Sequence, residues 1–170
     1  SRFTGGIFRL DFYAKEEIEE IIERSAKILR FRLSPEAKAA IGERSRFTPR
    51  LANRLLKRCR DYSQIYNKNF IDEKSVEETL KLLEIDELGL EKKDKRILEI
   101  IISKFNGGPV GLKTIAAAAS EEEATIEDVH EPYLMQLGLL ERTSRGRVVT
   151  PKAYVHLGVK QPSSVQEKLI

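Results

Sequence analysis

The stretch that decides the fold is FNGGPVGL at residues 105–112, which predicts the turn of a helix-turn-helix. Gly107, Gly108 and Pro109 end the preceding helix, because glycine and proline both interrupt helices. Further along, the sequence LLERTSRGRVVT at residues 139–150 predicts a small basic β-hairpin. A helix-turn-helix followed by such a hairpin is a winged helix, and helix-turn-helix folds commonly bind DNA.

The residues before this module predict a separate group of short helices, because their apolar side chains recur at helical spacing. The expected helices cover residues 16–29, 34–42, 48–62 and 72–83. Residues 85–90 break the pattern and are expected to form a linker, with the domain boundary near residue 88. The fold class predicted is mainly α, a helical subdomain followed by a winged-helix domain.

Within the second module, helices are expected over residues 94–105 and 112–119. Thr125 is expected to cap the next helix, because threonine at this position can accept from the first turn. Pro132 should kink or restart that helix. Residues 161–170 are polar and are expected to form a flexible tail.

The composition describes a helix-rich globular chain of 170 residues, with 41% hydrophobic and 34% charged residues. No apolar run approaches the roughly 20 residues that span a bilayer, and the first residues carry no signal-peptide pattern. A single cysteine, Cys59, suits a reducing compartment. The sequence therefore predicts a cytoplasmic protein.

The net charge of +3 is modest, but the basic residues are clustered. Three arginines and no acid lie between Arg142 and Arg147. Seven basic residues and no acid lie between positions 44 and 60: Arg44, Arg46, Arg50, Arg54, Lys57, Arg58 and Arg60. Local fields of this kind favour phosphate binding more than the total charge does.

The candidate recognition helix is acidic, since it carries Glu127, Asp128 and Glu131 after the run of glutamates at 121–123. Acids at this density repel phosphates, so close insertion of the helix into a DNA groove is not expected. Any DNA contact should therefore come from the hairpin.

The hairpin offers Arg142, Arg145 and Arg147 around Gly146. We expect Arg145 and Gly146 to form a tight turn that lets the tip approach a DNA backbone, with the other two arginines flanking it. Phosphate or minor-groove contact by arginine needs no base sequence, so the binding predicted is largely sequence-independent and salt-sensitive. The alternative is a solvated hairpin in a winged helix that contacts protein.

A second basic site begins at Thr48-Pro49, which predicts a helix start with Thr48 as its cap. Arg50 then lies in the first turn, beside free amide groups, where a phosphate oxygen can bind. The alternative is an ordinary solvated basic helix.

Other candidate sites are weak. His130 and His156 lie far apart without further metal ligands nearby, and Cys59 lies on an apolar stripe, so structural roles are expected for all three. The chain contains no G-x-x-x-x-G-K-[ST] loop, and no catalytic residues or metal site are predicted.

Several runs together resemble the C-terminal half of the RuvB family, the motors of bacterial Holliday-junction branch migration. The resemblance covers nearly all of residues 1–158. The runs are RSRFTPR at 44–50, NRLLKR at 53–58, GGPVGL at 107–112, TIEDVHEPYL at 125–134 and RTSRGR at 142–147.

The resemblance implies a fold of three parts: a large AAA+ nucleotide-binding domain, a small helical lid and a winged helix. Residues 1–13 then correspond to the end of the large domain, 14–88 to the lid and 89–160 to the winged helix. The large domain's Walker motifs are missing from the sequence, so this chain alone is expected not to hydrolyse ATP.

The resemblance also implies residue roles. Arg50 matches the family's sensor-2 arginine, which reaches the nucleotide phosphates. Tyr13 matches a tyrosine that lies against the nucleotide, and Arg2 matches an arginine in the region of the trans-acting finger. Arg142 and Arg147 match the family's DNA-contacting arginines of the wing.

The implied function is that of an ATP-dependent DNA helicase in recombination and repair, with ATP and Mg²⁺ as cofactors of the whole motor. Implied partners are Holliday-junction and duplex DNA, further copies of the motor in a hexameric ring, the junction-binding protein RuvA and the resolvase RuvC. Tight binding of ATP to this chain alone is not expected. Alternatives are a stand-alone winged-helix transcription regulator, or the lid and winged helix of an origin-binding or clamp-loader AAA+ protein.

Overall fold

The computed structural model describes residues 13–66 and 68–161 and divides the chain into two compact units between Gly89 and Leu90. Arg2, residues 1–12 of the expected remnant (1–13) and residues 162–170 of the expected tail (161–170) lie outside the described residues.

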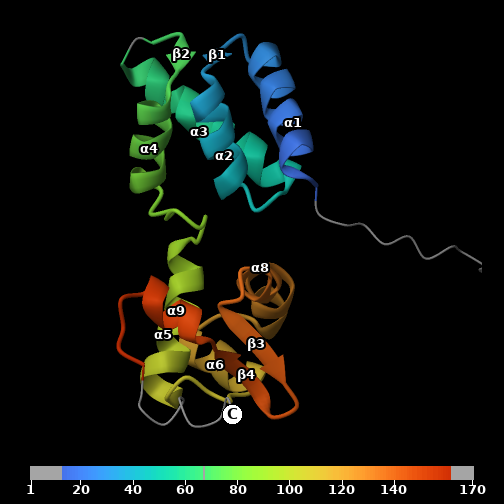
Figure 1. Cartoon of the computed structure of the whole chain (residues 1–170), viewed down its shortest axis with the longest axis vertical. Coiled ribbons are helices and arrows are strands. Elements are labelled where there is room, and N and C mark those ends of the chain that lie inside the picture. Colours follow the sequence, from blue (N-terminus) through green and yellow to red (C-terminus); the bar gives the residue numbers. More distant parts are fainter. Residues whose placement is uncertain (1–12, 67, 162–170) are drawn as a thin grey trace, which may run out of the picture. The chain divides into compact units, whose positions relative to one another are not determined.

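The first unit is a helical bundle with two short strands (Figure 1). The strands pair in parallel, with Arg32 opposite Phe70 and Leu33 opposite Ile71. The elements are α1 (Lys15–Ile28), β1 (Arg32–Leu33), α2 (Pro35–Arg44), α3 (Pro49–Ile65), β2 (Phe70–Ile71) and α4 (Glu73–Leu82).

The core of this unit follows the helical spacing of its apolar residues. Fully buried side chains include Ile18 and Ile22 of α1 and Leu55 of α3. Two apolar residues at helical spacing lie outside this core: Ile28, the last residue of α1, is 71% exposed, and Leu83, just after the end of α4, is 37% exposed.

Capping explains where these helices begin, with one correction. The Ser34 hydroxyl accepts from the Ala37 N–H at 3.0 Å, and Asp72 accepts from the Ser75 N–H at 2.8 Å. Thr48 occupies the expected N-cap position of α3 but makes no cap, because its hydroxyl donates backwards to the Ser45 carbonyl at 3.0 Å.

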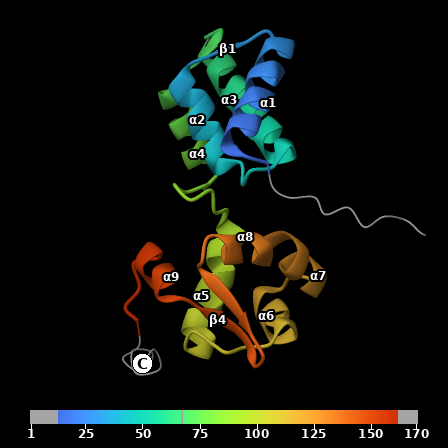
Figure 2. The same ribbon diagram turned by 45° about the vertical axis from the view of Figure 1, so that its right-hand side comes forward.

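The second unit contains the expected helix-turn-helix and hairpin (Figure 2). The mainly α fold class, with a helical first part and a winged helix after it, is confirmed. The elements are α5 (Lys92–Phe105), α6 (Leu112–Ala119), α7 (Glu123–Thr125), the π-helical turn η1 (Ile126–His130), α8 (Glu131–Gln136), β3 (Leu140–Thr143), β4 (Gly146–Val149) and α9 (Pro151–His156).

The glycine turn after α5 needs its glycines for packing. Asn106 ends the helix in a left-handed conformation with φ of 51°. A Cβ on Gly107, whose φ is 85°, would lie 2.2 Å from the hydroxyl oxygen of Tyr154, a buried residue of α9. The glycine-rich turn between α5 and α6 therefore packs directly against α9 at Tyr154.

Thr125 does not cap the recognition helix, which corrects the expectation from sequence. Thr125 has helical angles (φ −64°, ψ −42°), and the helical segment already begins at Glu123. The chain then widens into η1 and returns to α-helix at Glu131. Pro132 follows at once, and because proline has no N–H to donate, it fits a restart of the helix at this point.

The hairpin residues 139–150, called the wing below, contain an antiparallel ladder in which Arg142 pairs with Arg147 and Thr143 with Gly146. A third segment joins it: Val110 donates to the Arg147 carbonyl at 3.0 Å and accepts from the Arg147 N–H at 2.8 Å. The helix-turn-helix turn is thereby hydrogen-bonded to the wing.

Candidate nucleic-acid interface

The tip of the wing is the turn Ser144-Arg145. The Thr143 hydroxyl donates to the Gly146 carbonyl at 2.8 Å and accepts from the Arg145 N–H at 3.2 Å, which fixes the turn from within. The Arg145 side chain is exposed, and within the described part of the chain it has no hydrogen bond or ion pair. Its guanidinium is therefore available to an anionic ligand.

Gly146 serves a different purpose from the one expected. It lies in β4 rather than in the turn, with φ of 134°, and a Cβ there would lie 2.5 Å from the Val110 carbonyl oxygen. Glycine is required because the wing packs tightly on the helix-turn-helix turn.

Arg142 and Arg147 face the recognition helix. Arg147 donates through Nε to Glu131 Oε1 at 2.6 Å and through Nη2 to Oε2 at 3.1 Å. Arg142 donates to the same Oε2 at 3.3 Å. The hydrogen bonding between Arg147 and Glu131 is the main cause that raises the pKa of Arg147.

Glu127 adds a second carboxylate to this cluster. It accepts a short hydrogen bond from Arg142 and lies 3.8 Å from the Arg147 Nη2. Glu127 and Glu131 are four residues apart, so they share one face of the helical segment. Two acids of the recognition helix, Glu127 and Glu131, thus bind the wing arginines, a role that the sequence interpretation missed. The four-residue spacing was the available signal, but the pairing with the wing depends on tertiary structure.

A buried hydrogen-bonded pair links the middle of the recognition segment, at the end of η1, to α5. His130 Nδ1 lies 2.7 Å from Asp94 Oδ1, and both side chains are almost fully buried. Asp94 Oδ2 also accepts from the Glu91 N–H at 2.7 Å, which completes a capping box on α5. The structural role expected for His130 is confirmed.

At the first unit's basic site, Arg50 is exposed in the first turn of α3. The Thr48 side chain leaves this helix start uncapped, and the first turn contains no acid. Both features suit phosphate, which helix N-termini attract. Tyr13 is 47% exposed.

Arg46 behaves differently from the rest of that basic run. Its side chain is buried, and Nε donates to the Gly89 carbonyl at 3.2 Å. Arg46 and Phe47 both have positive φ, at 53° and 51°. The turn before α3 is thus fixed to the end of the first unit by a buried arginine that is withdrawn from solvent.

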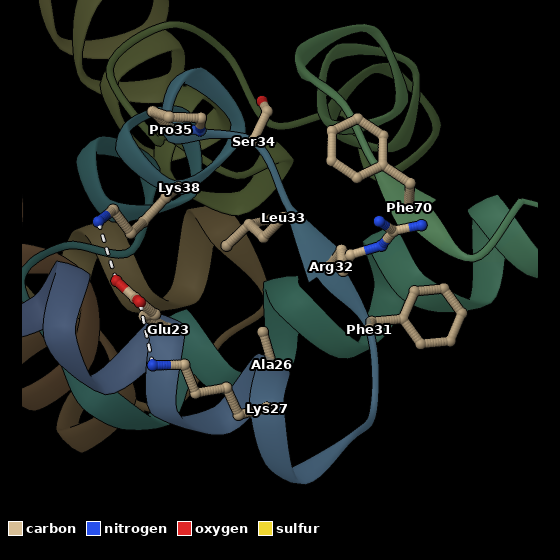
Figure 3. A pocket seen from close by; sticks show the side chains of 10 residues that line it. All are labelled: Glu23, Ala26, Lys27, Phe31, Arg32, Leu33, Ser34, Pro35, Lys38 and Phe70. Atoms are coloured by element: carbon tan, nitrogen blue, oxygen red, sulfur yellow. Dashed lines mark hydrogen bonds and ion pairs between the residues drawn. The ribbon is translucent and has the colours of Figure 1, made fainter.

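A hollow on the first unit is lined by residues of α1, β1 and α2 and by Phe70 of β2. It has a volume of about 400 Å³ and lies beside β1 and β2 (Figure 3). The Glu23 carboxylate lies between two ammonium groups, 3.1 Å from Lys27 and 3.2 Å from Lys38, and these two hydrogen bonds lower its pKa. No histidine or cysteine lines it.

Cys59 is fully buried, and burial raises the pKa of its thiol to about 12, so the core role expected for it is confirmed. Among the described residues no group of three or more His, Cys, Asp and Glu side chains is arranged to hold a metal ion. Over the same part of the chain, the helices are too short or too polar to cross a membrane.

Two family models match the chain. The RuvB AAA lid domain matches residues 13–86, and the RuvB C-terminal winged helix domain matches residues 87–158. The two matches meet between residues 86 and 87, within the linker expected from the sequence and three residues before the structural division after Gly89.

Curated relatives agree. The chain is 53% identical over 156 residues to the Holliday junction branch migration complex subunit RuvB of Chloroflexus aurantiacus, covering 92% of this chain and 45% of that protein. It is 54% identical, with the same coverage, to the RuvB subunit of Chloroflexus aggregans. This chain thus spans about half the length of the curated relatives it matches.

A solved structure gives the same result. The Thermotoga maritima RuvB Holliday junction branch migration motor superposes with a TM-score of 0.87 at 45% identity, covering 90% of this chain and 51% of that one. The two domain matches, the identities and this superposition agree with the order of elements and the runs of sequence described above. The chain therefore belongs to the RuvB family and carries that family's lid and C-terminal winged-helix domains.

Proposed function

We propose that the winged-helix unit binds duplex DNA through its wing, by contacts to the phosphate backbone that do not depend on base sequence. The observation that carries the proposal is the exposed, unpaired Arg145 at the tip, with the half-exposed Arg142 beside it. Arginine neutralises phosphates wherever the backbone passes, so such contacts suit a grip rather than the reading of a site.

The acidic recognition segment supports the same reading. Glu127, Asp128 and Glu131 would have to be desolvated against phosphates if this segment entered the major groove. A transcription regulator that reads bases with this helix is therefore disfavoured. Arg147, the third wing arginine proposed to contact DNA, is already paired with Glu131, so its contribution should be smaller than that of Arg145.

We further propose that the lid unit faces nucleotide. The features in favour are the uncapped start of α3, the exposed Arg50 and the exposed Tyr13. In the whole motor, ATP with Mg²⁺ would be bound mainly by the large domain, and Arg50 would add charge at the phosphates. Arg2 is proposed to belong to the finger region of that domain. This sequence lacks a Walker A loop, so the chain alone should not hydrolyse ATP.

The resulting function is the lid and DNA-gripping part of an ATP-dependent branch-migration motor. Its proposed partners are Holliday-junction DNA, copies of the motor in a ring, and the proteins RuvA and RuvC. The proposed location is the cytoplasm.

The test is fluorescence anisotropy of the chain with a labelled random-sequence duplex at low salt, competed by unlabelled duplexes of unrelated sequence. The proposal expects competitors of equal length to compete within about twofold, with affinity falling steeply as salt rises. One competitor sequence winning by a hundredfold or more would contradict it and favour a transcription regulator. No saturable binding at low salt would also contradict it.

A further inference from the structure

The wing ladder creates an electrostatic conflict that the recognition segment resolves. Arg142 and Arg147 are direct cross-strand partners, and like charges in such positions destabilise a sheet. The Glu131 carboxylate lies between them and bonds to both guanidinium groups. Glu131, shared by Arg142 and Arg147, therefore offsets the repulsion between these two cross-strand arginines.

The two carboxylates of this cluster differ in burial. The Glu131 side chain is 3% exposed and its partner Arg147 13% exposed, and their two-point contact excludes water from both groups. Breaking such a buried pair from one side is costly. Glu131 and Arg147 are therefore expected to stay together when DNA binds.

Glu127 and Arg142 form the solvent-facing half of the cluster. Each side chain is 46% exposed, and exposed ion pairs contribute little to stability. A phosphate oxygen offers the Arg142 guanidinium the same charge-assisted hydrogen bond that the Glu127 carboxylate now supplies. Exchange of one for the other leaves the Glu131 contact intact.

Resting on the proposed DNA-binding function, we propose that Glu127 is a counter-ion that a DNA phosphate displaces from Arg142. In the same proposal Glu131 is a positioning residue that keeps Arg142 directed at that phosphate. Before DNA binds, the two arginines of the cluster are matched by two glutamates, so the cluster has no formal charge. Among the described residues of the wing, Arg145 is then the arginine whose positive charge has no ion-pair partner.

The first experiment compares Glu127→Gln with Asp128→Asn in the full 170-residue chain, using anisotropy with a random-sequence duplex. Asp128 is the matched control, because it is the exposed neighbouring acid and makes no hydrogen bond or ion pair with the described wing arginines. The expected result is about two- to fivefold tighter binding for Glu127→Gln, and less than twofold change for Asp128→Asn. Equal effects of the two variants on DNA affinity would overturn the proposal that a phosphate displaces Glu127 from Arg142.

A second arm separates displacement from general repulsion. The gain from Glu127→Gln should disappear when Arg142 is also changed to Ala, because the guanidinium that the carboxylate occupies is then gone. Arg147, 3.8 Å from Glu127, stays paired with Glu131. A gain that persists in the Arg142→Ala background would mean that Glu127 only repels phosphates, and the proposal would be wrong.

The third arm tests Glu131. Because Glu131→Gln alone risks unfolding the unit, the background is the double variant Glu131→Met with Arg147→Met, which replaces the buried pair by apolar side chains of similar length. In the natural chain Arg142→Ala should weaken binding about fivefold. In the double-variant background it should weaken binding less than twofold, while an undiminished effect would refute the positioning role.

The arms also separate this inference from the function beneath it. Absence of saturable duplex binding by the natural chain overturns both. Duplex binding that Arg142→Ala weakens but Glu127→Gln leaves unchanged overturns the inference alone.

Discussion

Gly146 offers a quantitative test of how the wing is attached. Replacing it by Ala places a Cβ 2.5 Å from the Val110 carbonyl oxygen and 2.7 Å from the Val110 carbonyl carbon, both backbone atoms that no side-chain rotation can move. The substitution must therefore push the wing away from residue 110 and break the two hydrogen bonds between Val110 and Arg147.

The expected cost follows from these contacts. Two backbone hydrogen bonds contribute about 1 kcal/mol each, and an alanine held at φ of 134° adds strain of roughly 1–3 kcal/mol. Gly146→Ala should therefore destabilise the winged-helix unit by about 3–5 kcal/mol. For a unit of this size, each kcal/mol lowers the melting temperature by roughly 4–8 °C, so the shift should exceed about 10 °C.

Two other glycines serve as matched controls. Gly138 has φ of 68° but open space around its Cβ position, so Gly138→Ala should cost only the left-handed strain of about 1–2 kcal/mol. Gly111 has neither a positive φ nor a neighbour within 4 Å, so Gly111→Ala should cost less than about 1 kcal/mol.

The assay is thermal unfolding by circular dichroism, together with hydrogen exchange of the peptide that contains the Arg147 amide. Gly146→Ala should be the least stable of the three variants and should lose protection at Arg147. Equal melting temperatures for Gly146→Ala and Gly138→Ala would refute the close approach as the reason for glycine at position 146.

Three further predictions concern the lid unit. The pKa of Asp72 falls to about 2 because its carboxylate accepts hydrogen bonds from Ser75. The ionised carboxylate should therefore stabilise the unit above pH 3.8, and this stabilisation should disappear as the pH falls toward 2. In urea titrations, Asp72→Asn should remove the dependence of the unfolding free energy on pH over this range. Because burial raises the pKa of Cys59 to about 12, iodoacetamide at pH 8 should label it only after urea unfolds the chain, and labelling of the folded chain would contradict the buried position. Arg46→Ala should lower the free energy of unfolding by about 1–3 kcal/mol in urea titrations, because the Gly89 carbonyl loses its buried donor; an unchanged midpoint would contradict this.

Local sequence signals predicted the fold well where local chemistry decides it. Helices were expected to start at Ser34 and Asp72, and in the structure each of these residues caps its helix. The glycine-rich turn and the hairpin also occur where their residues predicted them. Thr125 shows the limit of such signals. A threonine resembles a cap in sequence, but here the helix already starts at Glu123 and runs through Thr125 into a π-helical turn before Pro132.

The candidate site was less predictable, because it depends on contacts between distant residues. Sequence placed Arg142, Arg145 and Arg147 together on one hairpin, as the structure does. It could not show that Glu131 would reach across to two of them. The acidic residues of the recognition helix suggested repulsion of DNA. In the structure two of them, Glu127 and Glu131, form hydrogen bonds with the wing arginines.

The most direct test of the central claim is an NMR titration of the ¹⁵N-labelled chain with a random-sequence duplex. The account predicts that the largest shifts fall on the backbone amides of residues 142–147 and on the side-chain Nε–H groups of Arg142 and Arg145. Amides of α1 to α4 should move little, and the Arg147 Nε–H should keep its bond to Glu131. Shifts concentrated on the lid, or on the recognition segment with the wing unchanged, would contradict the account.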